Sequence, residues 1–377
     1  MNILFISHEK YLNGASKSLL ELIKCLQEKH DITVLSSYKD GKFMDKLKEM
    51  NVKILILPYY RWIERKNIYV RWILYKLRWN IWGNKRNKKS AHIIAQYVYK
   101  NNIDIIHSNS SVIDIGIRVK KIVPIKHIMH LREFGDLDFN MTPFISYNSL
   151  FKKMNEGTDK FICISKAIYK HYKLLQKEKK VIVYNGVSKS NLILKEKKYE
   201  NIIHIIIAAR ISKEKGQDIA IKAIQILIKR NIKNIRLYLA GAGIIQIPRG
   251  CEKYIKHLGF VDNISEIRSD MDIEIVCSKA EAFGRVTIEA MLGGLVVVGS
   301  NSGGTSELIQ DRITGLLFEN GNPIDLANKI EYLINNRKDM YNIAKSGQQY
   351  AISKFYIERC ADEIDKIYNE LISISGN

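Results

Sequence analysis

The chain has 377 residues, of which 46% are hydrophobic and 26% charged, a composition typical of a globular protein long enough for two domains. It has no run of about 18 apolar residues, no secretory signal pattern and only five widely spaced cysteines, so we expect no membrane-spanning helix, disulfide framework or zinc site, and reduced thiols in the cytoplasm. The formal net charge of +21 indicates an anionic partner, such as nucleic acid, an anionic membrane or a phosphorylated ligand.

Short runs of Ile, Val and Leu alternate with amphipathic stretches along the first half of the chain. A helix is predicted at 18–28. Strands are predicted at 2–7, 31–37, 53–58, 104–109, 126–130, 160–165 and 181–186. Because these apolar runs do not alternate with polar residues, they favour a parallel sheet covered by helices on both faces.

The pattern pauses at 186–201, a polar, lysine-rich stretch that is typical of a linker, and then begins again. The second half predicts a helix at 218–230 and another from Gly284, with strands at 202–210, 235–243, 271–278 and 295–300. Two successive arrays of this kind predict an α/β protein with two doubly wound, Rossmann-like domains facing a central cleft. We place the domains at 1–188 and 189–357, with a C-terminal helix at about 358–377 that packs back on the first domain.

Charged residues follow two strands of the second half, where ligands of such sheets bind. Arg210 and Lys215 lie five residues apart in a turn that leads into a helix, and two cations there can hold a diphosphate. Farther along, Glu281 and Glu289 flank the turn at Gly284, and carboxylates are good acceptors for vicinal hydroxyls. The alternative is that all four are solvated surface residues. Glycine-containing turns at 241–243 and 301–308 are further candidates for anion binding.

Together these motifs resemble glycosyltransferase family 4, the retaining enzymes of the GT-B fold, from residue 2 to the C-terminal helix. The resemblance rests on AARISKEKG (208–216), YLAGAG (238–243), SKAEAFGRVTIEAM (278–291) and NSGGTSELIQDRITGLLF (301–318). It implies that a nucleotide-sugar donor binds to the second domain and that the first domain binds the acceptor.

The resemblance also implies roles for individual residues. Arg210 and Lys215 would hold the donor diphosphate, Glu289 the ribose hydroxyls, and Glu281 the hydroxyls of the donated sugar. Backbone amides of Phe283, Gly284 and Arg285 would help to bind the sugar and the phosphate. Phe260 and Val261 would lie by the base.

In the first domain, Gly14 resembles the glycine of the family's first βα turn, near the donor phosphate. His107 and His130 match histidines at strand ends, and His130 is the one expected near the anomeric carbon; a structural role is the alternative. Arg132 and Glu133 are acceptor-side candidates, and the Asn-Gly pair at 185–186 resembles a structural element near the family's hinge.

The implied mechanism is same-face transfer, in which the enzyme stabilises negative charge on the leaving diphosphate. Two D-x-D sequences, at 136–138 and 270–272, resemble the metal motif of the other glycosyltransferase fold, but we interpret both as chance occurrences. We therefore predict no cofactor and no essential metal.

Residues 59–89 hold all four tryptophans, and from Arg61 onward the stretch has ten Lys/Arg and one acid. On a helix, one stripe would pack on the core, namely Val70, Ile73, Leu74, Leu77 and Ile81. The opposite face would meet an anionic membrane through Trp72, Trp79, Trp82, Arg71 and Arg78, with Tyr75 on the same side. The alternatives are a helix whose tryptophans pack inside the first domain, or a site for single-stranded nucleic acid.

The favoured interpretation is a cytoplasmic, peripheral membrane glycosyltransferase of bacterial surface polysaccharide synthesis. It would move a sugar from a UDP- or GDP-sugar to a glycan or lipid-linked acceptor. The alternatives are a nucleotide-sugar 2-epimerase of the same fold and a basic nucleic-acid-binding protein. The sugar, the nucleotide, the linkage and the oligomeric state do not follow from the sequence.

Overall fold

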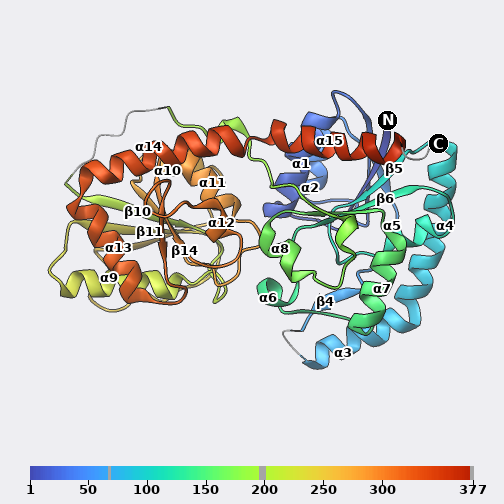
Figure 1. Cartoon of the computed structure of the whole chain (residues 1–377). Coiled ribbons are helices and arrows are strands. Elements are labelled where there is room, and N and C mark those ends of the chain that lie inside the picture. Colours follow the sequence, from blue (N-terminus) through green and yellow to red (C-terminus); the bar gives the residue numbers. More distant parts are fainter. Residues whose placement is uncertain (67–68, 195–200, 374–377) are drawn as a thin grey trace. The chain divides into compact units, whose positions relative to one another are not determined.

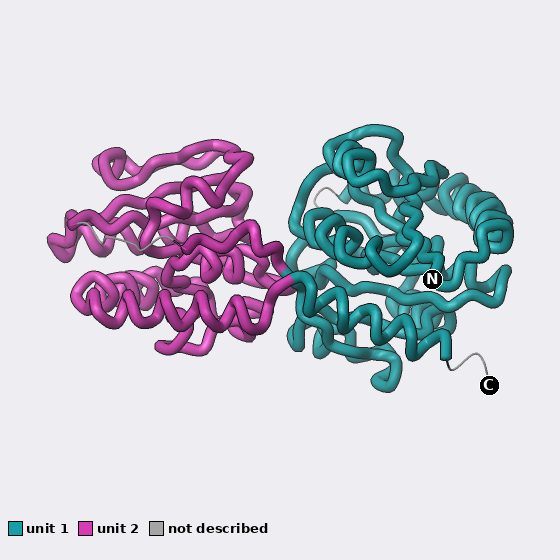
Figure 2. Tube along the Cα trace, turned by 90° about the horizontal axis from the view of Figure 1, so that it is seen from above, with its two compact units in different colours: residues 1–186, 357–377 teal, residues 187–356 magenta. Residues whose placement is uncertain are grey.

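The computed structural model describes residues 1–66, 69–194 and 201–373, shown in chain order in Figure 1. The chain divides into two compact units, coloured separately in Figure 2. Unit 1 is Met1–Gly186 together with Ile357–Asn377, and unit 2 is Val187–Tyr356. The predicted domain boundary after residue 188 therefore lies two residues from the observed division.

Unit 1 contains a seven-stranded parallel sheet in the order β3-β2-β1-β5-β6-β8-β9. Its strands are β1 (Asn2–Ser7), β2 (Asp31–Ser36), β3 (Lys53–Ile56), β5 (Ile105–Ser108), β6 (Lys126–Leu131), β8 (Lys160–Cys163) and β9 (Lys180–Ile182). The order reverses beside β1, which is the mark of a doubly wound sheet. A separate antiparallel ribbon joins β4 (Ile63–Arg65) to β7 (Met141–Pro143).

Unit 1 also contains helices, most of which bury apolar side chains. They are α1 (Gly14–Leu26), α2 (Lys42–Glu49), α3 (Tyr69–Arg78), a π-helical turn η1 (Trp79–Gly83), α4 (Asn84–Lys100), α5 (Ile115–Lys120), α6 (Asp136–Phe139), α7 (Tyr147–Gly157), α8 (Lys166–His171) and the C-terminal α15 (Ile357–Ser373). One cluster of buried side chains joins α15 to α1 and to the strands, and includes Leu19, Leu22, Ile364 and Tyr368. The C-terminal helix is thus part of the core of unit 1.

Unit 2 contains a six-stranded parallel sheet in the order β12-β11-β10-β13-β14-β15. Its strands are β10 (Ile203–Ala208), β11 (Ile235–Ala240), β12 (Ile255–Gly259), β13 (Ile273–Val276), β14 (Val296–Ser300) and β15 (Leu316–Phe318). Its α-helices are α9 (Gln217–Lys229), α10 (Ile264–Arg268), α11 (Arg285–Leu292), α12 (Thr305–Leu308), α13 (Pro323–Asn335) and α14 (Arg337–Lys354). The prediction of a doubly wound α/β fold is confirmed in both units.

The sequence did not predict several elements, among them the helices α7 and α13 and the strands β12 and β15. β12 and β15 are the two edge strands of unit 2, where one side needs no apolar partner and the pattern is weak. Part of the predicted linker, 195–200, lies outside the described residues. No helix within the described ranges is long and apolar enough to cross a bilayer.

The predicted orientation of the helix at 69–83 is wrong. Trp72 and Trp79 are buried, 9% and 5% exposed, and both rings pack on Phe144. The predicted core stripe instead faces solvent, except for the half-buried Ile73. The physical reason is size, because two tryptophans seven residues apart share a face and bury more apolar area than aliphatic side chains do.

Candidate active site

Several of the residues predicted to bind the donor lie in loops that leave the carboxyl ends of adjacent strands in unit 2. The loop after β10 contains Arg210 and Lys215, the loop after β13 contains Glu281, and the loop at 301–304 follows β14. The strand order reverses between β10 and β13, because β11 and β12 extend on one side and β14 and β15 on the other. This reversal is where open α/β sheets form their ligand crevice.

Lys215 and Glu281 meet directly at that reversal. The Lys215 ammonium lies 2.7 Å from a carboxylate oxygen of Glu281, and the two side chains are 33% and 22% exposed. Burial would raise the pKa of Glu281, but the Lys215 charge outweighs it and holds the pKa below the ordinary value. A charged pair that solvent still reaches is therefore placed at the position expected for a ligand.

Glycines allow the two loops to touch through their backbones. The amide of Gly304 donates to the Glu281 carbonyl oxygen at 2.6 Å. A Cβ on Gly303, whose φ is +53°, would lie 2.5 Å from the same oxygen, and one on Gly304 would lie 2.5 Å from the Phe283 carbonyl oxygen. Only glycine fits at these two positions. The close backbone contact of the turn at 301–304 therefore fixes the position of the loop that carries Glu281.

Glu289 lies on α11 and is held by two arginines. One of its oxygens accepts from Arg268 Nη1 at 3.1 Å, and the other accepts from Arg285 Nε at 3.0 Å. Arg268 is 1% exposed and also forms a two-point pair with the buried Glu274 of β13, at 2.7 and 3.1 Å. Burial disfavours charge on Arg268, but Glu274 and Glu289 together raise its pKa, so the guanidinium stays charged.

The other predicted donor-side residues fall into two groups. Arg210 is exposed, and its side chain makes no hydrogen bond or ion pair within the described part of the chain. Phe260, which follows β12, is 66% exposed, and Val261 beside it is half-buried. Phe283 is buried against Phe355, while Gly284 is the N-cap of α11 and has a φ of +100°. The structure thus brings Lys215, Glu281 and the glycine turn together and leaves Arg210 and Phe260 on the surface of unit 2.

In unit 1, His130 belongs to a buried chain of hydrogen bonds. Its Nδ1 lies 3.2 Å from His107 Nε2 and 3.3 Å from Arg132 Nη2. His107 Nδ1 in turn lies 2.6 Å from the hydroxyl oxygen of Tyr368, on α15. His130 Nε2 is buried and has no hydrogen-bond partner among the residues that the structure describes.

The donors in this chain determine where the protons are. Burial lowers the pKa of His107 and of His130 well below the ordinary value, and Arg132 lowers both further, so both rings are neutral. A guanidinium can only donate, so His130 Nδ1 must accept. His107 Nε2–H then donates to that same nitrogen, and the Tyr368 hydroxyl donates to His107 Nδ1. The proton of His130 is therefore on Nε2, where the ring presents an unused N–H donor.

Arg132 and Glu133 are buried and support the surrounding loops. Arg132 donates to Asn109 Oδ1 at 2.6 Å and to Asn185 Oδ1 at 2.8 Å. Glu133 Oε1 accepts from the Ser111 amide at 2.9 Å and from the hydroxyls of Ser110 and Ser111, while burial raises its pKa. These contacts give both residues a structural role, and their acceptor-side role stays a prediction.

Gly14 is the first residue of α1 and is exposed, with Asn13 as the cap. The Asn13 side chain accepts from the amides of Ala15 and Ser16, at 2.9 and 3.0 Å. A Cβ on Gly14 would meet no atom within 4 Å. Steric packing within the protein therefore does not require glycine at this position. Close approach of a ligand to this backbone is the remaining explanation.

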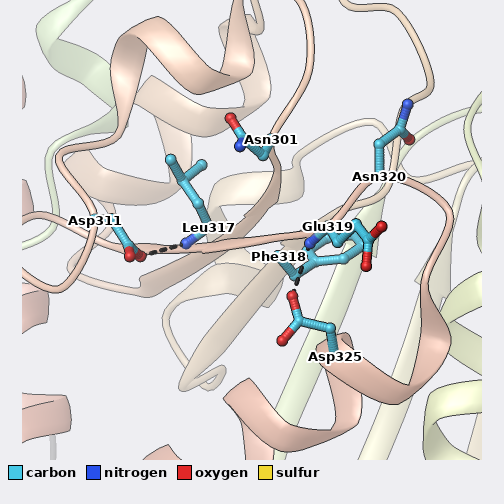
Figure 3. Close-up of a pocket in the computed structure, with 7 residues that line it drawn as sticks. All are labelled: Asn301, Asp311, Leu317, Phe318, Glu319, Asn320 and Asp325. Atoms are coloured by element: carbon cyan, nitrogen blue, oxygen red, sulfur yellow. Dashed lines mark hydrogen bonds between the residues drawn. The ribbon is translucent and has the colours of Figure 1, made fainter.

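Figure 3 shows a pocket of about 560 Å³ in unit 2 that includes Asn301 of the 301–304 turn but is lined by neither Lys215 nor Glu281. Two of its carboxylates already accept from backbone amides, Asp311 from Leu317 at 2.7 Å and Asp325 from Glu319 at 2.8 Å. Because these acids stabilise the turn and the start of α13, the pocket is not a better candidate than the loops beside Glu281.

The two D-x-D sequences also use carboxylates for backbone contacts. Asp138 accepts from the amides of Phe134 and Gly135, at 3.0 and 2.8 Å, and Asp272 accepts from the His204 amide at 2.8 Å. Residues 1–66, 69–194 and 201–373 contain no group of three or more His, Cys, Asp or Glu arranged to hold a metal ion.

Sequence reasoning did not find Arg268, Gln217 or Tyr368. Gln217 is buried and donates to the carbonyl oxygen of Arg210 at 3.0 Å, which fixes the loop after β10. Each of the three lies in an amphipathic or polar stretch without a motif. A weak signal existed only for Arg268, as an arginine directly before a predicted strand that contains Glu274.

Comparison with known proteins gives matches along most of the chain. Residues 12–191 match the model named Glycosyltransferase Family 4, and residues 188–350 match the model named Glycosyl transferases group 1. An uncharacterised glycosyltransferase of Methanocaldococcus jannaschii is 29% identical over 339 residues, 86% of this chain and 92% of the relative. An O-antigen biosynthesis glycosyltransferase of Escherichia coli, WclY, is 28% identical over 230 residues, 56% of this chain and 62% of the relative.

Solved structures share the fold at low sequence identity. HepE of Anabaena, determined in complex with UDP, superposes with a TM-score of 0.80 at 21% identity, over 98% of this chain and 100% of that chain. The same protein was also determined with UDP-glucose and superposes with a TM-score of 0.77 at 20% identity. At this level of identity the likeness shows the fold alone.

Proposed function

This chain belongs to the group 1 glycosyltransferases, with a family 4 first half, and we propose that it transfers a sugar from a nucleotide-sugar donor with retention of configuration. The observation that carries the proposal is the pair of Lys215 and Glu281 at the strand-order reversal of unit 2. A diphosphate beside Lys215 would compete for its ammonium and release the Glu281 carboxylate to accept from sugar hydroxyls. Arg210, exposed in the same loop, would supply a second cation.

Glu289 is the proposed acceptor for the ribose hydroxyls. Its two oxygens already face Arg268 and Arg285, and a carboxylate oxygen has lone pairs left for a further donor. The arginines would keep the carboxylate ionised and fixed in orientation, so that little entropy is lost when the nucleotide binds. Phe260 and Val261, in the turn after β12, are proposed to lie near the base.

The proposed reaction is a same-face displacement in which charge develops on the leaving diphosphate. Lys215, Arg210 and the start of α11 would stabilise that charge. His130 is proposed to contact the donated sugar through its Nε2–H, as a hydrogen-bond donor and not as a base. Metal independence is part of the proposal, and it is supported by the D-x-D carboxylates, which already accept from backbone amides.

The proposed donor is a UDP- or GDP-sugar, and the HepE complexes with UDP and UDP-glucose support the UDP class. The proposed acceptor is a glycan or a lipid-linked saccharide of surface polysaccharide synthesis, supported by the O-antigen relative. A lipid-linked acceptor lies at a bilayer, so the proposed setting is the cytoplasmic face of the cell membrane.

The test is donor turnover in two variants of unit 2, Arg210→Ala and Glu281→Ala, with a donor chosen by thermal shift from UDP- and GDP-sugars. We expect kcat/KM to fall by a factor on the order of 10² to 10³ in each, since each removes a contact to the reacting part of the donor. The matched controls are Arg230→Ala and Glu331→Ala. Those side chains form a 2.6 Å pair in the same unit, at the end of α9 and thus on the opposite edge of the sheet.

Near wild-type turnover in Glu281→Ala, with normal folding, would contradict the donor site. NMR of the product would test the stereochemistry separately, because an inverted anomer would overturn the retaining mechanism and leave the donor site intact.

A further inference from the structure

Unit 1 exposes a row of apolar side chains along α3 and η1. We call the row Val70, Leu74, Leu77, Ile81 and Trp82 the apolar ridge; its members are 66%, 60%, 51%, 52% and 62% exposed. The spacing of four, three and four residues places the first four on one helical face. Monomeric soluble proteins seldom expose a contiguous apolar patch of this kind without a binding role.

The helix is firmly attached on its opposite face, so the exposure is a feature of the fold. Trp72 and Trp79 pack on Phe144 with ring centroids 6.1 and 5.8 Å apart, and Trp72 Nε1 donates to the Thr142 carbonyl oxygen at 3.4 Å. A Cβ on Gly83 would lie 3.1 Å from the Trp79 ring, so the π-helical turn holds that ring closely. The ridge cannot turn inward without removing these rings from the core.

The surroundings of the ridge are strongly cationic. Between Glu64 and Asp104 the chain has ten Lys/Arg and no acidic residue. The exposed cations on α3 and at the start of α4 are Arg71, Arg78, Lys85, Arg86, Lys88 and Lys89. An apolar strip bordered by cations is complementary to a surface with an apolar interior and anionic groups at its edge.

We propose that the apolar ridge and these cations bind unit 1 to an anionic lipid surface, with the helix lying parallel to the bilayer plane. The ridge would insert between the headgroups, and the cations would lie at the level of the lipid phosphates. A second copy of this chain is a poorer occupant, because the two faces would bring twelve exposed like charges together, six from each copy. The proposal concerns a surface of unit 1 and does not depend on the donor chemistry of unit 2.

The contact needs both components. Apolar insertion gives partition into any bilayer, and the cations add selectivity for anionic lipid that salt can screen. The structure therefore predicts binding that has an apolar part and an electrostatic part. Substitutions on α3 should remove the first, and substitutions on α4 should remove the second.

The test is flotation of the whole protein with two kinds of vesicle, one of phosphatidylcholine alone and one with about one third phosphatidylglycerol. One variant carries Val70→Ser, Leu74→Ser and Leu77→Ser, and another carries Lys85→Gln, Lys88→Gln and Lys89→Gln. We expect each to lower partition onto the anionic vesicles by about tenfold or more. All six positions are exposed, so thermal melting should stay close to that of the wild type.

Matched controls remove equivalent side chains from other exposed positions of unit 1. The control for the apolar part changes three exposed apolar residues to Ser, namely Ile122, Leu137 and Leu174, which are 40%, 58% and 54% exposed. The control for the electrostatic part changes three exposed lysines to Gln, namely Lys170, Lys173 and Lys177. We expect both control proteins to bind as the wild type does. Wild-type binding should also weaken when salt rises from about 0.1 M to about 1 M.

Three outcomes would overturn the proposal. One is equal binding to the two kinds of vesicle, and another is undiminished binding of the serine variant. The third is a concentration-dependent dimer without lipid that the serine variant abolishes, because the occupant of the ridge would then be a second copy of the chain.

Discussion

Arg268 lies between two carboxylates, Glu274 on β13 and Glu289 on α11, and its side chain is almost fully buried. Burial raises the pKa of Glu274, and the neighbouring guanidinium opposes that rise. A buried group of three charges is costly to desolvate, so its presence is weak evidence for stability and better evidence for a fixed arrangement. At this position the arrangement fixes Glu289, the proposed ribose acceptor.

Arg268→Met should strongly destabilise unit 2, because it leaves Glu274 and Glu289 without their shared cation. We expect a loss of about 3 to 5 kcal/mol in the free energy of unfolding, measured by urea denaturation. The control is Arg230→Met, which breaks a surface pair of similar geometry, with side chains 34% and 32% exposed, and should cost about 1 kcal/mol or less.

The double variant Arg268→Met with Glu274→Leu separates two explanations of that loss. If the uncompensated charge on Glu274 causes it, the double variant should recover a large part of the stability. Failure to recover would mean that the loss comes from packing around Arg268 and not from charge.

At the scale of elements, the start of α1 makes the role of Gly14 testable. Alanine fits there sterically and favours helix, so Gly14→Ala should leave the melting temperature unchanged or raise it slightly. If the donor phosphate approaches this backbone, the added methyl group should raise the donor KM by about tenfold. Initial-rate kinetics measure this effect, with Lys17→Ala, an exposed change on the same helix, as the control. An unchanged donor KM would separate Gly14 from the donor.

Among the helices, α3 shows why a periodic pattern alone can assign the wrong face. The sequence predicted an amphipathic helix with its cations outward, and the structure has such a helix. The pattern could not decide between an aliphatic and an aromatic stripe, because both are apolar and both have helical spacing. Phe144, about 70 residues away, determines the buried face by packing on Trp72 and Trp79.

At the scale of the molecule, unit 1 is completed by the last helix of the chain. A chain that ends at Tyr356 would lose buried side chains of α15, including Ile357, Ile364 and Tyr368. Each contributes about 1.5 to 3 kcal/mol, so the loss is comparable to the whole stability of a domain, and we expect unit 1 to lose its cooperative thermal transition. A chain that ends at Ser373, which keeps α15, is the control, and calorimetry measures both. A normal transition in the shorter chain would contradict this role of α15.

The sequence by itself determined the two parallel α/β arrays and the motif residues that lie after the strands, because these depend on local apolar runs and on short spacings. Only the tertiary structure decided that Lys215 pairs with Glu281, that Arg268 holds Glu289, and that Tyr368 orients His107 and thereby His130. These contacts join residues between 21 and 261 positions apart. They arise where strand order and helix packing bring distant segments together, and no local pattern encodes that arrangement.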